Sequence, residues 1–133
     1  MALVQSSAAA APGWPWITFA VNILGACGAL LRFFVDGVVA GRIGRDFPLG
    51  TLVVNVSGAL ALGLVVGLGF SGDRLVLVGT ATLGSYTTFS TWMLETQRLA
   101  EAGELGNAAG NALISLVVGL GAAALGRLVG AHL

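Results

Sequence analysis

Long uncharged stretches dominate the pattern of hydrophobic and polar positions along the chain. Charged residues gather in three short clusters, which begin at Asp36, Asp73 and Glu95. The uncharged runs are the residues before Arg32 and then residues 47–72, 75–94 and 105–126. Each run reaches the roughly 20 residues that a helix needs to cross a bilayer. None has the polar face of a long helix in a soluble protein, so the pattern predicts an integral membrane protein.

The apolar runs favour helices over a β-barrel, because barrel strands alternate between polar and apolar positions. We predict an all-α membrane protein with four transmembrane helices near Trp16–Val35, Pro48–Phe70, Leu75–Arg98 and Asn107–Val129. The connections are short, so neighbouring helices should be antiparallel. Residues 16–133 would form a single domain after a flexible N-terminal extension over residues 1–15. That extension lacks the basic segment of a signal peptide, and we expect it to be retained.

Composition supports a lipid-facing surface and excludes several functions. The chain is 56% hydrophobic and 9% charged, with a mean hydropathy of +0.94, whereas soluble domains carry about 25% charged residues. A formal net charge of zero argues against nucleic-acid binding. The single cysteine, Cys27, excludes a disulfide framework. No nucleophile and base can be paired around the single histidine, His132, so we do not expect an enzyme.

Glycine accounts for 21 of the 133 residues. In lipid, helices associate through small residues that let their backbones approach closely. Pairs four residues apart have the spacing that this packing requires: Gly63/Gly67, Gly106/Gly110 and Gly126/Gly130. We expect these glycines to serve packing. So much small-residue surface on four helices also favours a homo-oligomer.

Polar side chains inside the predicted spans are the first candidates for function, because lipid makes each of them costly. Thr51 and Asn55 lie four residues apart on one face of the second segment. Asn111 and Ser115 repeat this spacing in the fourth segment. The alternative role is hydrogen bonding between helices, worth about 0.6 kcal/mol on average. The residues alone leave both roles open.

The middle of the third segment, residues 79–92, is rich in glycine, serine and threonine. Such residues lower helix propensity and offer the backbone alternative hydrogen bonds. We therefore predict an interrupted helix, which membranes tolerate where it is buried in protein or lines a cavity. Freed carbonyl oxygens near 84–88 could bind a small cation, and flexible packing is the alternative. Phe89 and Trp92 share a face just beyond, as core aromatic pairs usually do.

Three stretches resemble motifs of the Fluc (CrcB) family of fluoride channels. The glycine–arginine signature of the first helix is matched by Gly28-Ala-Leu-Leu-Arg32. The second-helix motif is matched by residues 47–58, and the third-helix motif by Thr87-Thr-Phe-Ser-Thr-Trp92 followed by Glu95. The motifs occur in the family's order, and the resemblance covers nearly the whole chain from Gly25 onward.

The resemblance implies a four-helix subunit that pairs with an inverted copy of itself in the cell (inner) membrane. This dual-topology homodimer would conduct fluoride passively along two pathways and relieve fluoride toxicity. A structural sodium ion would lie at the dimer interface. The arginines suit dual topology because their positive-inside bias is weak. One side of the predicted helices carries Arg32, Arg42, Arg45 and Arg98, and the other carries Arg74 and Arg127.

Motif positions of the family also assign individual roles. The resemblance places the fluoride pathway at Asn55, Thr51, Phe89, Trp92, Asn111 and Ser115. It places Arg32 and Glu95 at the pore mouth, and the backbone carbonyls of Gly84 and Thr87 around the sodium ion. The chain departs from the family pattern twice: Trp92 stands where phenylalanine is usual, and Ser85-Tyr86 replaces a glycine–apolar pair.

Two other functions compete with a fluoride channel. A small proton-coupled multidrug exporter also uses four helices, but it needs an acidic residue deep in a span, typically the first. The predicted first span holds none. A membrane assembly subunit without transport would use the packing glycines. It would not require Asn55, the interrupted segment and the aromatic pair together.

Overall fold

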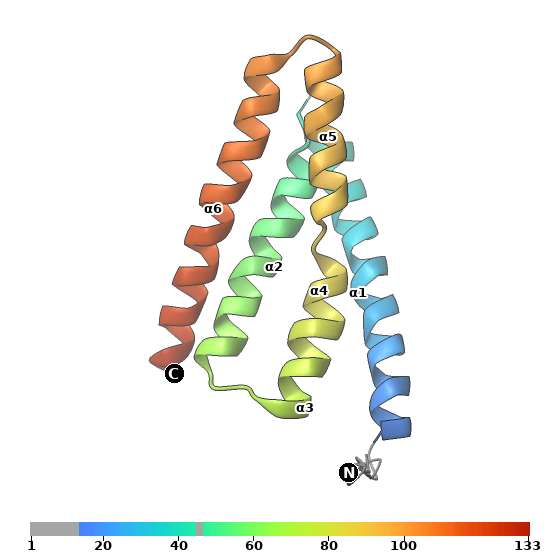
Figure 1. Cartoon of the computed structure of the whole chain (residues 1–133), viewed down its shortest axis with the longest axis vertical. Coiled ribbons are helices and arrows are strands. Elements are labelled where there is room, and N and C mark those ends of the chain that lie inside the picture. The colour runs from blue at the N-terminus through green and yellow to red at the C-terminus, as the bar shows by residue number, and fades with distance from the viewer. Residues whose placement is uncertain (1–13, 45–46) are drawn as a thin grey trace, which may run out of the picture.

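The computed structural model describes residues 14–44 and 47–133, and the regular structure in these ranges is helical (Figure 1). The prediction of an all-α protein is confirmed. In chain order the elements are α1 (Trp14–Ile43), α2 (Leu49–Gly67), α3 (Gly72–Arg74), the π-helix η1 (Leu75–Leu83), α4 (Gly84–Tyr86), α5 (Phe89–Glu101) and α6 (Leu105–Ala131).

Three helices in the described part of the chain are long and apolar enough to cross a membrane, over Pro15–Ile43, Leu49–Gly67 and Leu105–Ala131. The third predicted span consists of two shorter parts. α3, η1 and α4 follow one another without a gap over 72–86, and α5 covers the second part. The membrane-spanning character of the chain therefore stands, while the arrangement of four spans stays a prediction.

α1 extends further in both directions than the predicted first span. It begins at Trp14 and continues to Ile43, so that Asp36 lies within the helix. The predicted end at Val35 was wrong, because a single charged residue ends an apolar run without ending a helix. Pro15 fits the first turn, where its missing N–H would have no helical partner. The predicted flexible extension falls on residues 1–13, outside the described residues, and on the first two residues of α1.

The predicted interruption of the third segment is confirmed. α4 ends at Tyr86, and the next two residues are extended: Thr87 has φ −78° and ψ 160°, and Thr88 has φ −147° and ψ 122°. Thr88 then caps α5, since its Oγ1 accepts a hydrogen bond from the Thr91 N–H at 3.2 Å. The π-helical conformation of η1 before the break was not predicted.

Two of the predicted glycine pairs bring α2 and α6 into close contact. A Cβ atom on Gly63 would collide with the Ala123 carbonyl, and one on Gly126 would collide with the Leu60 carbonyl. The second members of both pairs lie equally close to the opposite backbone: Gly67 on α2 and Gly130 on α6. The packing role predicted for these pairs is confirmed.

The packing role of Gly106/Gly110 stays a prediction, because no other helix of the described chain covers this pair. Among the described residues, nothing lies within 4 Å of a Cβ atom on Gly106, and one on Gly110 would meet the Ile114 side chain of its own helix. The spacing of four residues puts two glycines on one helix face, but it does not decide whether another helix covers that face.

α1 packs on the other side of the bundle, against the half of the third segment that precedes the break. A Cβ atom on Gly28 would collide with the Ser85 hydroxyl and the Thr82 carbonyl. Figure 1 shows α6 beside α2 and α1 beside α4, with α5 continuing beyond the break. The break therefore lies near the middle of the long axis. Large apolar side chains of α1 face outward, with Phe33 80% exposed.

Candidate functional site

Asn55 of α2 pairs with the backbone at the helix break. Its Nδ2 donates to the Thr88 carbonyl oxygen at 2.9 Å, and its Oδ1 accepts from the Thr88 N–H at 2.8 Å. The N–H of Thr88 can only donate, so this exchange fixes which way round the amide lies. Asn55 thus satisfies both backbone groups of Thr88 and keeps a second amide hydrogen. No partner for that hydrogen occurs among the described residues.

The break also frees carbonyl oxygens. In a continuous helix the Thr88 N–H would bond to the Gly84 carbonyl, but here it bonds to Asn55. The carbonyl of the extended residue Thr87 lies 3.5 Å from Arg32 Nη1, which is long for a hydrogen bond. Neutral backbone oxygens suit hard cations such as sodium. The two carbonyls predicted to hold sodium therefore fit that role, as two ligands of a larger set.

An open groove of about 350 Å³ lies along α2, the break and α6. Four of the residues expected along the fluoride pathway line it: Asn55, Phe89, Trp92 and Ser115. The rings of Phe89 and Trp92 meet edge to face, with centroids 5.5 Å apart and planes at 85°. The Phe89 side chain is 70% exposed in the single chain. The groove therefore combines an amide, a hydroxyl and two aromatic rings.

Asn111 lies behind the groove, between α5 and α6. Its side chain is 1% exposed. Its Nδ2 donates to Thr96 Oγ1 at 2.8 Å, and the Ser115 hydroxyl lies 3.5 Å from its Oδ1. Its backbone carbonyl accepts a hydrogen bond from Trp92 Nε1 at 3.0 Å. Asn111 therefore connects α5 and α6, two of the helices that line the groove.

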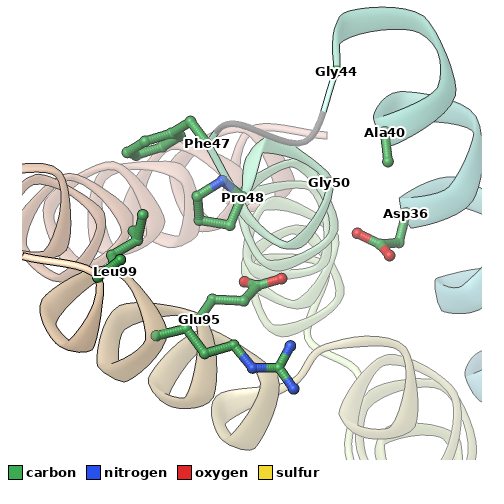
Figure 2. A pocket seen from close by; sticks show the side chains of 10 residues that line it. Asp36, Ala40, Gly44, Phe47, Pro48, Gly50, Glu95 and Leu99 are labelled. Carbon is green, nitrogen blue, oxygen red and sulfur yellow. The ribbon is translucent and has the colours of Figure 1, made fainter. Parts of the chain in front are cut away.

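Thr51 and Glu95 form a second polar site, about one turn from Asn55 towards the beginning of α2. Thr51 Oγ1 donates to Glu95 Oε1 at 2.8 Å. The second carboxylate oxygen of Glu95 is buried and has no hydrogen-bond partner in the described part of the chain. A pocket of about 350 Å³ opens beside it. Figure 2 shows the carboxylates of Glu95 and Asp36 pointing into this space from α5 and α1, close to Gly50.

A small cavity of about 90 Å³ lies between α1, α2 and α5. Its polar lining comes from Arg32, Asp36, Thr51, Thr88 and Thr91. Arg32 and Glu95, which were expected together at a pore mouth, line different spaces, and Asp36 lines both. Asp36 was not predicted as a site residue, because it follows the predicted end of the first span at Val35 and was grouped with the charges beyond it. Its spacing of four from Arg32 was the signal that could have placed both on one face of α1.

Thr51 and Asn55 lie one turn apart on α2 and divide the expected site residues into two groups. Asn55 belongs to the open groove, and Thr51 belongs to the small cavity. Thr88 connects the groups, because it bonds to Asn55 and lines both spaces. The sequence placed Thr88 only at the end of the range 84–88 that was expected to free carbonyl oxygens, and it did not indicate the contact with Asn55. The groove and the small cavity therefore meet at Thr88.

Comparison with known proteins yields one family and many relatives. The family described as "CrcB-like protein, Camphor Resistance (CrcB)" matches residues 19–127. "Fluoride-specific ion channel FluC 2" of Mycolicibacterium paratuberculosis is 55% identical over 107 residues, covering 80% of this chain and 88% of the relative. A protein of the same name from Mycobacterium tuberculosis is 50% identical over 114 residues, covering 86% and 89%. "Fluoride-specific ion channel FluC 1" of Rubrobacter xylanophilus is 47% identical over 105 residues, covering 78% and 85%.

Proposed function

This chain belongs to the CrcB-like protein family, and we propose that it is a passive, fluoride-selective channel of the cell membrane. It is a multi-pass membrane protein, and relatives that are 50% and 55% identical to it are named fluoride-specific ion channels. The single observation that carries the proposal is the Asn55–Thr88 pairing, which holds a polar break open beside two aromatic rings. An ion channel is not an enzyme, and the proposal requires no chemical step.

The composition of the groove suits a small, strongly hydrated anion. Removing water from fluoride costs many kcal/mol unless other donors replace it. A fixed cation could hold the ion too tightly, whereas conduction requires binding that also permits exit. The groove offers neutral donors: the second amide hydrogen of Asn55 and the hydroxyl of Ser115. Aromatic edges carry partial positive charge, so Phe89 and Trp92 add weak sites. Chloride is larger and would gain less from such closely spaced donors.

We place the pathway along the groove, past Thr88, and towards the pocket at Glu95. Thr51 would pass the ion between the small cavity and the Glu95 carboxyl, to which it is hydrogen-bonded. Arg32 would raise the local concentration of anions from the wall of the same cavity. Asn111, which the resemblance placed along this pathway, would contribute to its wall between α5 and α6.

The proposal includes an antiparallel homodimer and a structural sodium ion. Two features of the single chain support a second copy: the groove is open on one side, and Phe89 is largely exposed beside it. An inverted copy would bring a second Gly84 and a second Thr87 carbonyl to the interface. Sodium would then offset the repulsion between four carbonyl oxygens. It would stabilise the dimer and would not be transported.

A passive pore would serve to relieve fluoride toxicity. Fluoride enters cells as its neutral acid, ionises inside and is trapped as the anion. An open anion path lets it leave down its electrochemical gradient, so no energy source is needed.

Fluoride efflux from proteoliposomes tests this proposal. Vesicles loaded with potassium fluoride would be triggered with valinomycin and followed with a fluoride electrode, with potassium chloride vesicles run in parallel. We expect rapid fluoride release without chloride release. Equal release of both ions, or no release from folded and reconstituted protein, would contradict the proposal.

A small multidrug exporter is the alternative function, and one structural observation is relevant to it. Such an exporter needs an acid in its first helix, and Asp36 does lie on α1. However, the Asp36 carboxylate lies against Gly50, at the beginning of α2, and not beside the middle of that helix. The efflux assay also separates the two functions, because proton-coupled export would require a pH gradient, whereas passive fluoride flow requires only the membrane potential. An assembly subunit would give no flux under either condition.

A further inference from the structure

Trp92 and Thr96 of α5 form one hydrogen-bonded cluster with Asn111 of α6. The indole Nε1 of Trp92 donates to the Asn111 carbonyl oxygen at 3.0 Å. The Asn111 side chain returns across the helix contact, with its Nδ2 donating to Thr96 Oγ1 at 2.8 Å and lying 3.5 Å from the Trp92 carbonyl. Thr96 Oγ1 in turn donates to that carbonyl at 2.8 Å.

The cluster uses the indole N–H, which is the strongest donor that Trp92 could offer an ion. We propose that Asn111 is a positioning residue for Trp92. Together with Thr96, it holds α5 against α6, so that the indole N–H stays bound to the Asn111 carbonyl. Only the C–H groups of the indole ring then face the groove. This inference rests on the proposed fluoride function. In it, Asn111 affects conduction only by positioning the Trp92 ring and does not contact the ion.

The chemistry explains why the N–H should be withheld. An indole N–H is a donor without acceptor capacity, and hydrogen bonds to a charged partner are roughly twice as strong as neutral ones. A free N–H in the groove would retain fluoride, and conduction requires that the ion leave again. With the N–H bound elsewhere, Trp92 presents the groove with the weak edge of an aromatic hydrocarbon. Asn111 thus lets a tryptophan act in the groove as a phenylalanine would.

The test observes the ring directly in the full-length, reconstituted protein. Replacing Trp14 and Trp16 with phenylalanine leaves Trp92 as the single tryptophan, which would be labelled as 5-fluorotryptophan for fluorine NMR. The variants are Asn111→Ala and the nearly isosteric Thr96→Val, which removes the hydroxyl with little change in volume. Thr96→Ser keeps the hydroxyl as the conservative rescue. Asn107→Ala is the matched control, because Asn107 lies one turn earlier on α6, is exposed and bonds to Glu104.

We expect one narrow resonance in the reference protein, Thr96→Ser and Asn107→Ala, and a shifted or broadened resonance in Asn111→Ala and Thr96→Val. Fluoride flux in the last two should fall about tenfold, since one hydrogen bond to an ion changes its retention by at least this factor. An unchanged resonance in both would overturn the inference, even if flux fell, because the residues would not act through the ring. A changed resonance with undiminished flux would also overturn it.

Fluoride flux and the fluorine NMR resonance test the proposed function and the positioning role independently. If the reference protein shows no fluoride flux, the proposed function fails, while the NMR comparison still decides whether Asn111 holds the ring. If Asn111→Ala does not fold, Thr96→Val and its serine rescue carry the same comparison.

Discussion

Asn55 and Thr88 exchange two hydrogen bonds across 33 residues of sequence, and this exchange keeps the third segment divided. A helix break exposes backbone groups that lipid cannot satisfy. The side-chain amide of Asn55 matches the N–H and carbonyl of Thr88, as a neighbouring strand would. The residue that gives the groove its amide donor is therefore also the residue that holds the backbone open.

Asn55→Asp should abolish fluoride flux. A carboxylate cannot donate to the Thr88 carbonyl, and it would repel an anion in the groove. Two like charges about 4 Å apart repel by about 4 kcal/mol at an effective dielectric constant near 20, so we expect at least about a 100-fold loss. The proteoliposome efflux assay measures it. Asn107→Asp is the control, because it makes the same change at an exposed residue. Undiminished flux in Asn55→Asp would remove Asn55 from the pathway.

Phe89→Ile should reduce fluoride flux by roughly 3- to 10-fold, since edge contacts of aromatic rings are worth about 0.5–1.5 kcal/mol. Folding of the subunit should survive, because this side chain is 70% exposed. Phe33→Ile provides the control at an 80% exposed phenylalanine of α1 that is not among the residues lining the groove. Efflux rates together with the elution volume in detergent separate loss of conduction from loss of assembly. If both variants conduct normally, the ring of Phe89 plays no part in the pathway.

Gly126→Ala should destabilise the bundle, because the new Cβ atom would collide with the Leu60 carbonyl of α2. Overpacking of this kind costs about 1–3 kcal/mol, and a carbonyl cannot move aside as a flexible side chain would. Gly121→Ala on the same helix is the control, since nothing lies within 4 Å of a Cβ atom there. It should be neutral or stabilising by about 0.5–1 kcal/mol. Thermal unfolding in detergent measures both, and equal midpoints would mean that α2 and α6 are not in close contact.

The sequence could predict the elements whose causes are local. Runs without charge predicted the apolar helices, and the concentration of small and hydroxyl residues predicted the break, which the backbone at Thr87 and Thr88 confirms. The family motifs then brought Asn55, Phe89 and Trp92 into one hypothesis, and all three line one groove.

What the sequence could not predict depends on contacts between distant segments. The hydrogen-bond partner of Asn55 could not be identified from the sequence, because the fold is what brings α2 beside the break. Gly106 and Gly110 have the same spacing as Gly126 and Gly130, but α2 covers only the second pair. Asp36 looked like a loop charge because helix ends are set by capping and backbone geometry, which a change in polarity does not report.

The last prediction concerns the removal of sodium. It distinguishes ion binding by the backbone carbonyls at the break from ion binding by the side chains there. If the carbonyls of Gly84 and Thr87 hold a structural sodium ion between two copies, protein reconstituted in sodium-free buffer should lose fluoride flux and recover it when sodium is added back. Thr87→Ala should retain this sodium dependence, because the substitution keeps the carbonyl and removes a hydroxyl that bonds to Leu83. Efflux measured across a sodium titration, with potassium as the comparison ion, provides the test. Flux that is independent of sodium in the unaltered protein would exclude the ion from the structure, and a dependence abolished by Thr87→Ala would move the site from the backbone to the side chain.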